Sequence, residues 1–76
     1  PSLVWLVGTW GQGVWMYLET GLGGTKITAW RDGTVLAIAG EPVDADGYTW
    51  IQVIDPQGRL GWIPERYLVY DGQRNR

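Results

Sequence analysis

The stretch that decides the fold is Gly61-Trp62-Ile63-Pro64-Glu65-Arg66-Tyr67-Leu68, together with Tyr48-Thr49-Trp50-Ile51-Gln52-Val53-Ile54 before it. β-Branched and aromatic residues are frequent in both segments, as they are in β-strands. Between them, Asp55-Pro56-Gln57-Gly58 is typical of a type I turn completed by a glycine at positive φ. This part of the chain therefore predicts a hairpin, and Pro64-Glu65-Arg66 predicts a single 3₁₀ turn before a last strand at 67–70.

Glycines and turn dipeptides divide the rest of the chain into short segments, which indicates an all-β domain rather than a helical bundle. Twelve of the 76 residues are glycine, and glycine disfavours long helices. We expect further strands at 3–7, 14–18, 26–30 and 34–39, and loops at 19–24 and 41–47. One domain is expected over residues 1–70, followed by a polar, frayed tail at 71–76.

Charge and composition exclude several classes of function. Six Lys and Arg side chains stand against eight Asp and Glu, a formal net charge of −2, so the basic surface that binds nucleic acid is not expected. No apolar run reaches the roughly 18 to 20 residues that span a bilayer, and the first residues lack the basic leader of a signal peptide. Because the chain begins at Pro1 without Met, we interpret it as a piece of a larger protein.

A catalytic role is not expected either. Cysteine and histidine are absent and the single serine lies near the N-terminus, so a hydroxyl nucleophile would lack its activating base, and disulfides and the usual zinc sites are excluded. The acidic segment Asp44-Ala45-Asp46-Gly47 offers only two of the alternating ligands of a calcium loop, and we interpret its side chains as loop caps. Gly21-Leu22-Gly23-Gly24 lacks the Lys-Ser/Thr of a phosphate loop. We therefore predict no catalytic residue, metal or cofactor.

A surface for peptide recognition is predicted at Trp50, Pro64 and Tyr67, which together combine large apolar faces with polar groups. Ile51 and Val53 are the natural core-facing pair of their strand. The side chain of Trp50 should therefore point outward and be exposed.

The other aromatic residues divide into rim and core. Tyr17 and Trp15, on the strand at 14–18, are expected at the rim of the recognition surface. Trp62, Trp30 and Trp5 are expected in the core, because a domain this small needs bulky side chains there.

Four motifs follow one another along the chain at compatible spacing: Gly13 to Tyr17, Ile27 to Thr34, Asp46 to Val53, and Gly58 to Leu68. Their order resembles the bacterial SH3-like domain family, over about three quarters of the chain. The resemblance implies a small, SH3-like, partly open β-barrel of five to seven short strands, with a noncatalytic role. It also implies a secreted or cell-envelope location and binding of cell-wall peptides or other proteins.

Two departures qualify what the resemblance implies. The family's Asn and Arg in the second strand are Trp15 and Tyr17 here, so recognition by those polar groups is missing. Conversely, Ile63-Pro64-Glu65-Arg66-Tyr67 resembles the Ile-Pro-x-x-Tyr ending of eukaryotic SH3 domains, whose Trp, Pro and Tyr line a groove for polyproline II peptides. The loop before Ile27 contains only Glu19, unlike the acidic specificity loop of those domains.

We therefore expect a noncatalytic recognition or anchoring module that binds a peptide or protein segment, with cell-wall peptidoglycan as one option. The alternative is a structural subunit or spacer whose aromatic patch is covered by another part of the parent protein. The start at Pro1 and the six tryptophans in so short a chain favour that alternative.

Overall fold

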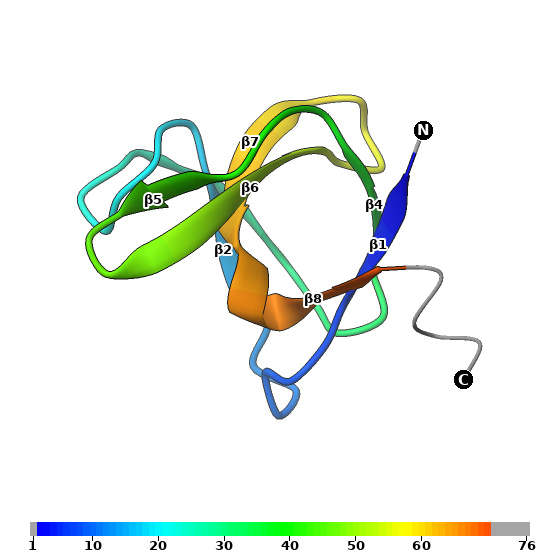
Figure 1. Ribbon diagram of the computed structural model, residues 1–76. Helices are drawn as coiled ribbons and strands as arrows, with labels where there is room; N and C mark the ends of the chain where they lie inside the picture. Colours follow the sequence, from blue (N-terminus) through cyan, green and yellow to red (C-terminus); the bar gives the residue numbers. More distant parts are fainter. Residues whose placement is uncertain (1, 71–76) are drawn as a thin grey trace.

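The computed structural model describes residues 2–70, which form one open antiparallel sheet of eight short strands (Figure 1). The strands are β1 (Leu3–Leu6), β2 (Val14–Tyr17), β3 (Lys26–Trp30), β4 (Val35–Ile38), β5 (Val43–Ala45), β6 (Tyr48–Ile54), β7 (Leu60–Pro64) and β8 (Leu68–Tyr70). One 3₁₀ turn, η1 (Glu65–Tyr67), stands between β7 and β8. The predicted all-β class is confirmed, whereas the tail predicted at 71–76 lies outside the described residues.

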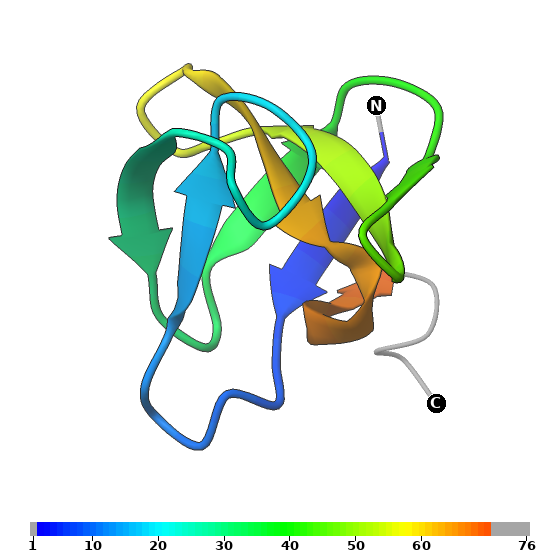
Figure 2. The same ribbon diagram turned by 90° about the vertical axis from the view of Figure 1, so that its left-hand side faces the viewer.

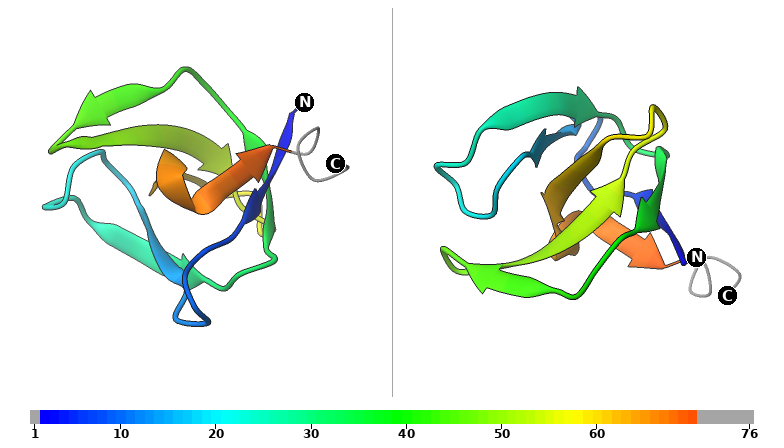
Figure 3. Two further views of the ribbon diagram at one scale, coloured as in Figure 1. Left: turned by 60° about the horizontal axis from the view of Figure 1, so that its bottom comes forward. Right: turned by 90° about the horizontal axis from the view of Figure 1, so that it is seen from above.

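Neighbouring strands follow the order β3-β2-β7-β6-β4-β1-β8, and β5 pairs with β6 beside this path. The sheet is strongly curved, so β3 and β2 lie across from β5 and the start of β6 (Figure 3). The first and last strands, β1 and β8, pair with each other. Within residues 2–70 the sole helical element is the short η1, and no helix there is long enough to cross a membrane.

The hairpin predicted from the deciding stretch is present. β6 and β7 pair from Trp50↔Pro64 to Ile54↔Leu60. Gly58 has a φ of 85°, as the turn sequence predicts. The 3₁₀ turn also forms, one residue later than predicted.

A buried carboxylate fixes the turn of this hairpin. The side chain of Asp55 accepts hydrogen bonds from the backbone N–H groups of Gln57 and Arg59, at 2.9 and 2.8 Å, and from Nε of Arg59 at 2.9 Å. Burial opposes ionisation of this carboxyl group, but the three donors and the guanidinium charge outweigh it and lower the pKa of Asp55. The register between β6 and β7 is therefore held by an ionised side chain as well as by the backbone ladder.

One strand was not predicted. Residues 43–45, expected within a loop, form β5, which pairs with β6 through Ala45↔Tyr48. The connection is the two-residue Asp46-Gly47, with φ values of 53° and 78°, and positive φ at both positions is the signature of a type I′ hairpin turn. The Asp-Gly signal was present in the sequence, but the flanking strand is too short to show the alternation of apolar residues that marks longer ones.

The core lies on the concave face of the sheet. Its buried members are Val4, Leu6, Met16, Leu36, Ile51, Val53 and Ile63. Gly61 approaches this cluster so closely that a Cβ atom there would lie 2.5 Å from Cγ of Met16. A side chain at this position would displace Met16, which explains why glycine occupies the middle of β7.

The tryptophans predicted in the core are mostly elsewhere. Trp62 pairs with Gln52 on the face opposite Ile63, and it is only half-buried. Trp5 alternates with the buried Val4 and Leu6 and is half-buried as well. The core prediction is therefore wrong for both, because strand alternation turns them away from the concave face.

Trp30 is the one tryptophan of these three that packs against the core cluster. Its Nε1 atom is buried and has no hydrogen-bond acceptor among residues 2–70.

Candidate binding site: an aromatic hollow

Trp50 is turned away from the core, as predicted, but it is not exposed. Its side chain has an exposed fraction of 0%, so the prediction of an open tryptophan is wrong. β5 pairs beside it through Val43↔Trp50, and the indole Nε1 donates a hydrogen bond to the backbone oxygen of Ala45 at 2.9 Å. The edge of β6 is thus covered by a strand that the sequence did not predict.

Two tyrosines complete the packing around Trp50. The ring centroid of Tyr17 lies 5.4 Å away at an interplanar angle of 88°, and that of Tyr48 lies 6.2 Å away at 68°. Edge-to-face contacts of this kind stabilise aromatic clusters beyond their buried area. Trp50 is therefore the fixed centre of a second apolar cluster on the outer face of β6.

A hollow of about 220 Å³ opens above this cluster, and we call it the aromatic hollow. It is lined by Gly13, Val14, Trp15, Tyr17, Leu22, Tyr48, Trp50, Pro64 and Tyr67. All five residues predicted for the recognition surface are among them. Their role in binding a ligand remains a prediction.

Strand pairing explains how distant parts of the chain meet here. Tyr17↔Trp62 sets β2 beside β7, and Trp50↔Pro64 sets β7 beside β6. The aromatic hollow is therefore lined by residues of three strands, β2, β6 and β7, and by Tyr67 of η1.

The loop at 18–25 forms one side of the hollow. In Figure 2 this loop, in cyan, crosses in front of β7 between β2 and the β5–β6 hairpin. The backbone N–H of Leu22 donates to Oδ2 of Asp46 at 2.9 Å, which ties the loop to the β5–β6 turn. Leu22 itself is 56% exposed and Trp15 is 46% exposed, so the hollow has an apolar rim open to solvent.

The hollow is lined mainly by apolar and aromatic side chains. Its only titratable side chains are the tyrosines, Tyr17, Tyr48 and Tyr67. Across residues 2–70 no three acidic side chains gather closely enough to hold a metal ion. The hydroxyl groups of these three tyrosines have no partner within that range, so they can bond to the backbone of a ligand.

Four of the residues that line the hollow were not predicted, and two of them, Tyr48 and Leu22, were missed for different reasons. Tyr48 stands two residues before Trp50 on the same strand, so the two-residue period could have placed both on one face. Leu22 lies in a glycine-rich loop, whose path no local pattern predicts.

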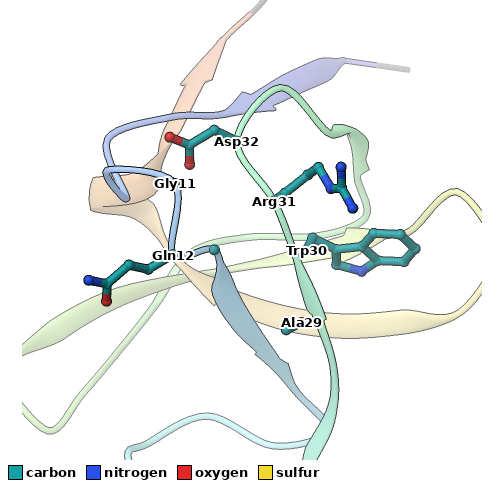
Figure 4. A pocket seen from close by; sticks show the side chains of 7 residues that line it. Gly11, Gln12, Ala29, Trp30, Arg31 and Asp32 are labelled. Atoms are coloured by element: carbon teal, nitrogen blue, oxygen red, sulfur yellow. The ribbon is translucent and has the colours of Figure 1, made fainter.

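A second pocket, of about 450 Å³, lies between the loop at 8–13 and the end of β3 (Figure 4). The carboxylate of Asp32 accepts hydrogen bonds from the backbone N–H and the hydroxyl of Thr9. In Figure 4 the side chains of Trp30 and Arg31 project away from the loop that carries Gly11. Asp32, the acidic residue of this pocket, thus holds the loop at 8–13 in place. We do not assign a ligand to the pocket.

Comparison of the chain with protein-family models, with curated proteins and with solved structures gave no match. The function is therefore argued from the aromatic hollow.

Proposed function

We propose that the chain is a noncatalytic recognition module with an SH3-like barrel fold, and that it binds an extended peptide or protein segment in the aromatic hollow. The observation that carries the proposal is the convergence of five aromatic side chains and Pro64 on one open depression. The curved sheet of short strands and the 3₁₀ turn before the last strand support the SH3-like assignment.

The chemistry of the hollow fits an extended ligand. Rigid aromatic faces accept proline or aliphatic side chains at little cost in conformational entropy, and free tyrosine hydroxyls bond to peptide carbonyls. With a volume of about 220 Å³, the hollow accommodates one or two side chains rather than a folded domain. A short segment in the polyproline II conformation satisfies both requirements, because its side chains and carbonyls are exposed.

Selection of random peptides displayed on phage against the immobilised chain tests the proposal. Tyr67→Ala should weaken the selected peptides by about 30-fold or more, since central aromatic anchors carry about 2 kcal/mol or more. Trp10→Ala, outside the hollow, is the matched control and should leave binding unchanged. Failure to select any peptide, or equal loss in both variants, would overturn the proposal. Trp50→Ala is unsuitable because Trp50 is buried.

A cell-envelope location and a cell-wall peptide as ligand are proposals that rest on the family resemblance. Retention of the chain on purified peptidoglycan, lost in Tyr67→Ala, would support them. No retention would point to a protein segment as the ligand instead.

The alternative function, a spacer whose patch is covered within a larger assembly, is favoured by the exposed apolar rim at Trp15 and Leu22. Sedimentation velocity distinguishes the two. Self-association that Trp15→Ser abolishes would favour the covered patch, whereas a monomer at all concentrations would favour the recognition module.

A further inference from the structure

Two cations stand at the aromatic hollow, each against rings that line it. The Nζ atom of Lys26 lies 5.0 Å from the ring centroid of Trp15. The guanidinium carbon of Arg66 lies 5.5 Å from the ring centroid of Tyr67 and 6.0 Å from that of Tyr48. These distances are those of cation–π contacts, so both charges are held at the edge of the hollow.

The position of Lys26 depends on an irregularity in the sheet. β2 pairs with β3 through Met16↔Thr28 and then Tyr17↔Lys26, so one residue of β3 is skipped. Residues directly opposite each other project from the same face of a sheet. The bulge therefore brings the lysine to the face that carries Tyr17, where a regular ladder would bring Ile27.

Within residues 2–70 neither cation forms an ion pair with a carboxylate. The ion pair found within residues 2–70 is that between Arg59 and Asp55, at the far turn of the β6–β7 hairpin. Lys26 and Arg66 are both exposed, and each lies against an aromatic ring. Their positive charges are thus available to a ligand.

The carboxylates near the same rim are, by contrast, engaged within the chain. Asp46 accepts from the N–H of Leu22, Asp44 accepts from the hydroxyl of Thr49 at 2.8 Å, and Glu19 accepts from Thr25 at 3.3 Å. Glu65, next to Arg66, accepts from the hydroxyl of Tyr70 at 3.3 Å. Each of these carboxylates is thus oriented by a hydrogen bond from another residue of the chain.

We propose that the segment bound in the aromatic hollow is acidic, with Asp or Glu side chains on either side of the apolar residue that enters it. This inference rests on the proposed function. One ligand carboxylate bonds to Nζ of Lys26 and the other to the guanidinium group of Arg66, and charge-assisted bonds of this kind are the stronger class. Beside Arg66 a further pocket shares Tyr48 with the hollow and is also lined by Glu65, and the second carboxylate has space there next to the guanidinium group.

The phage selection described above also tests this inference, because the charge of the selected peptides is measured independently of their affinity. Peptides enriched in Asp and Glu are expected. Lys26→Glu and Arg66→Glu should each weaken them by about tenfold or more, because each variant replaces an attraction by a repulsion. Raising the salt concentration should weaken binding to the original chain in the same direction.

Arg31→Glu is the matched control, since it makes the same change in net charge at an exposed arginine that lines the other pocket. It should alter binding by less than about twofold. Equal melting temperatures of the three variants would show that each is folded.

The outcomes separate this inference from the function on which it rests. Selected peptides that are neutral or basic, yet lost in Tyr67→Ala, would overturn the acidic ligand and leave the recognition module standing. Peptides that bind Tyr67→Ala unchanged, or no peptides at all, would overturn both. Acidic peptides that respond equally to Arg31→Glu and Arg66→Glu would reduce the effect to net charge and also overturn the inference.

Discussion

Trp50 and Trp10 are the extremes of this small domain, since the first has no exposed surface and the second is 94% exposed. Trp50 lies on the outer face of its strand, where a large side chain would be exposed to solvent if nothing packed over it. Trp10 lies in the loop at 8–13, with a φ of 57° that non-glycine residues rarely adopt. The loop is held by Thr9, whose hydroxyl group contacts Asp32 and accepts from the N–H of Gly13 at 2.9 Å.

The contrast shows that the burial of an aromatic side chain depends here on which distant elements pack over it, rather than on whether its own residue lies in a strand or a loop. β5 and the ring of Tyr17 cover Trp50 from two directions. Hydrogen bonds fix the backbone around Trp10, but no element of residues 2–70 covers its ring. Left-handed backbone costs an ordinary residue roughly 1 to 2 kcal/mol, so Trp10 destabilises its loop slightly, whereas Trp50 stabilises the domain.

The largest expected effect is the loss of Trp50. Trp50→Ala should lower the free energy of unfolding by about 3 to 5 kcal/mol, the usual cost of removing a fully buried aromatic side chain. Trp10→Ala should change it by less than about 0.5 kcal/mol, as exposed substitutions do. Urea denaturation of both variants measures the difference. Similar losses would mean that Trp10 is covered in solution.

The next largest loss of stability is expected from a change in the turn that aligns β6, the strand of Trp50, with β7. Asp55→Asn should cost about 1 to 3 kcal/mol. The amide oxygen can still accept from the backbone N–H groups of Gln57 and Arg59, but the charge and the bond from Nε of Arg59 are lost.

The Asp55 carboxylate should also make the stability of the domain depend on pH in the acid range. The pKa of Asp55 is lowered in the folded chain. Its contribution to the free energy of unfolding is therefore complete at pH values above the unfolded-state pKa of about 3.9, and it disappears as the pH falls through the folded-state pKa. Denaturation between pH 7 and pH 2 should therefore show a steeper loss of stability for the original chain than for Asp55→Asn. Parallel curves would indicate that the ionised form is not the stabilising one.

A smaller difference in stability is expected between the loss of the indole N–H group of Trp50 and that of Trp30. Trp50→Phe removes the hydrogen bond to Ala45 and should cost about 1 kcal/mol more than Trp30→Phe. The N–H of Trp30 is buried without an acceptor among residues 2–70, so its removal leaves no partner unsatisfied. Thermal melting of the two variants is the measurement, and a larger loss in Trp30→Phe would imply an acceptor bound at that atom.

The smallest effect concerns the backbone of the exposed loop. Trp10→Gly should stabilise the domain by about 0.5 kcal/mol, because relief of left-handed strain slightly exceeds the entropy that glycine adds to the unfolded chain. Gly11→Ala is the matched control, since Gly11 has a φ of 82° and open space around it. It should destabilise by about 1 kcal/mol. A loss in Trp10→Gly would show that the indole makes a stabilising contact.

Much of the candidate site followed from local patterns. The hairpin, the glycine at positive φ and the 3₁₀ turn have short-range signals, and they bring Trp50, Pro64 and Tyr67 together. Trp15 and Tyr17 were predicted beside them from their strand. The hydrogen-bonded loop that contributes Leu22 and the strand that covers Trp50 had weak local signals or none.

By itself, the sequence determined the all-β class, most of the strands, the hairpin turn and the set of aromatic residues available for binding, because turn chemistry and two-residue alternation act between near neighbours. Only the tertiary structure decided which of these side chains are covered. It buried Trp50, left Trp62 on the outer face and set Lys26 and Arg66 against the rim. The physical reason is that exposure and charge compensation are properties of surfaces brought together from distant segments, and no period along one strand encodes them.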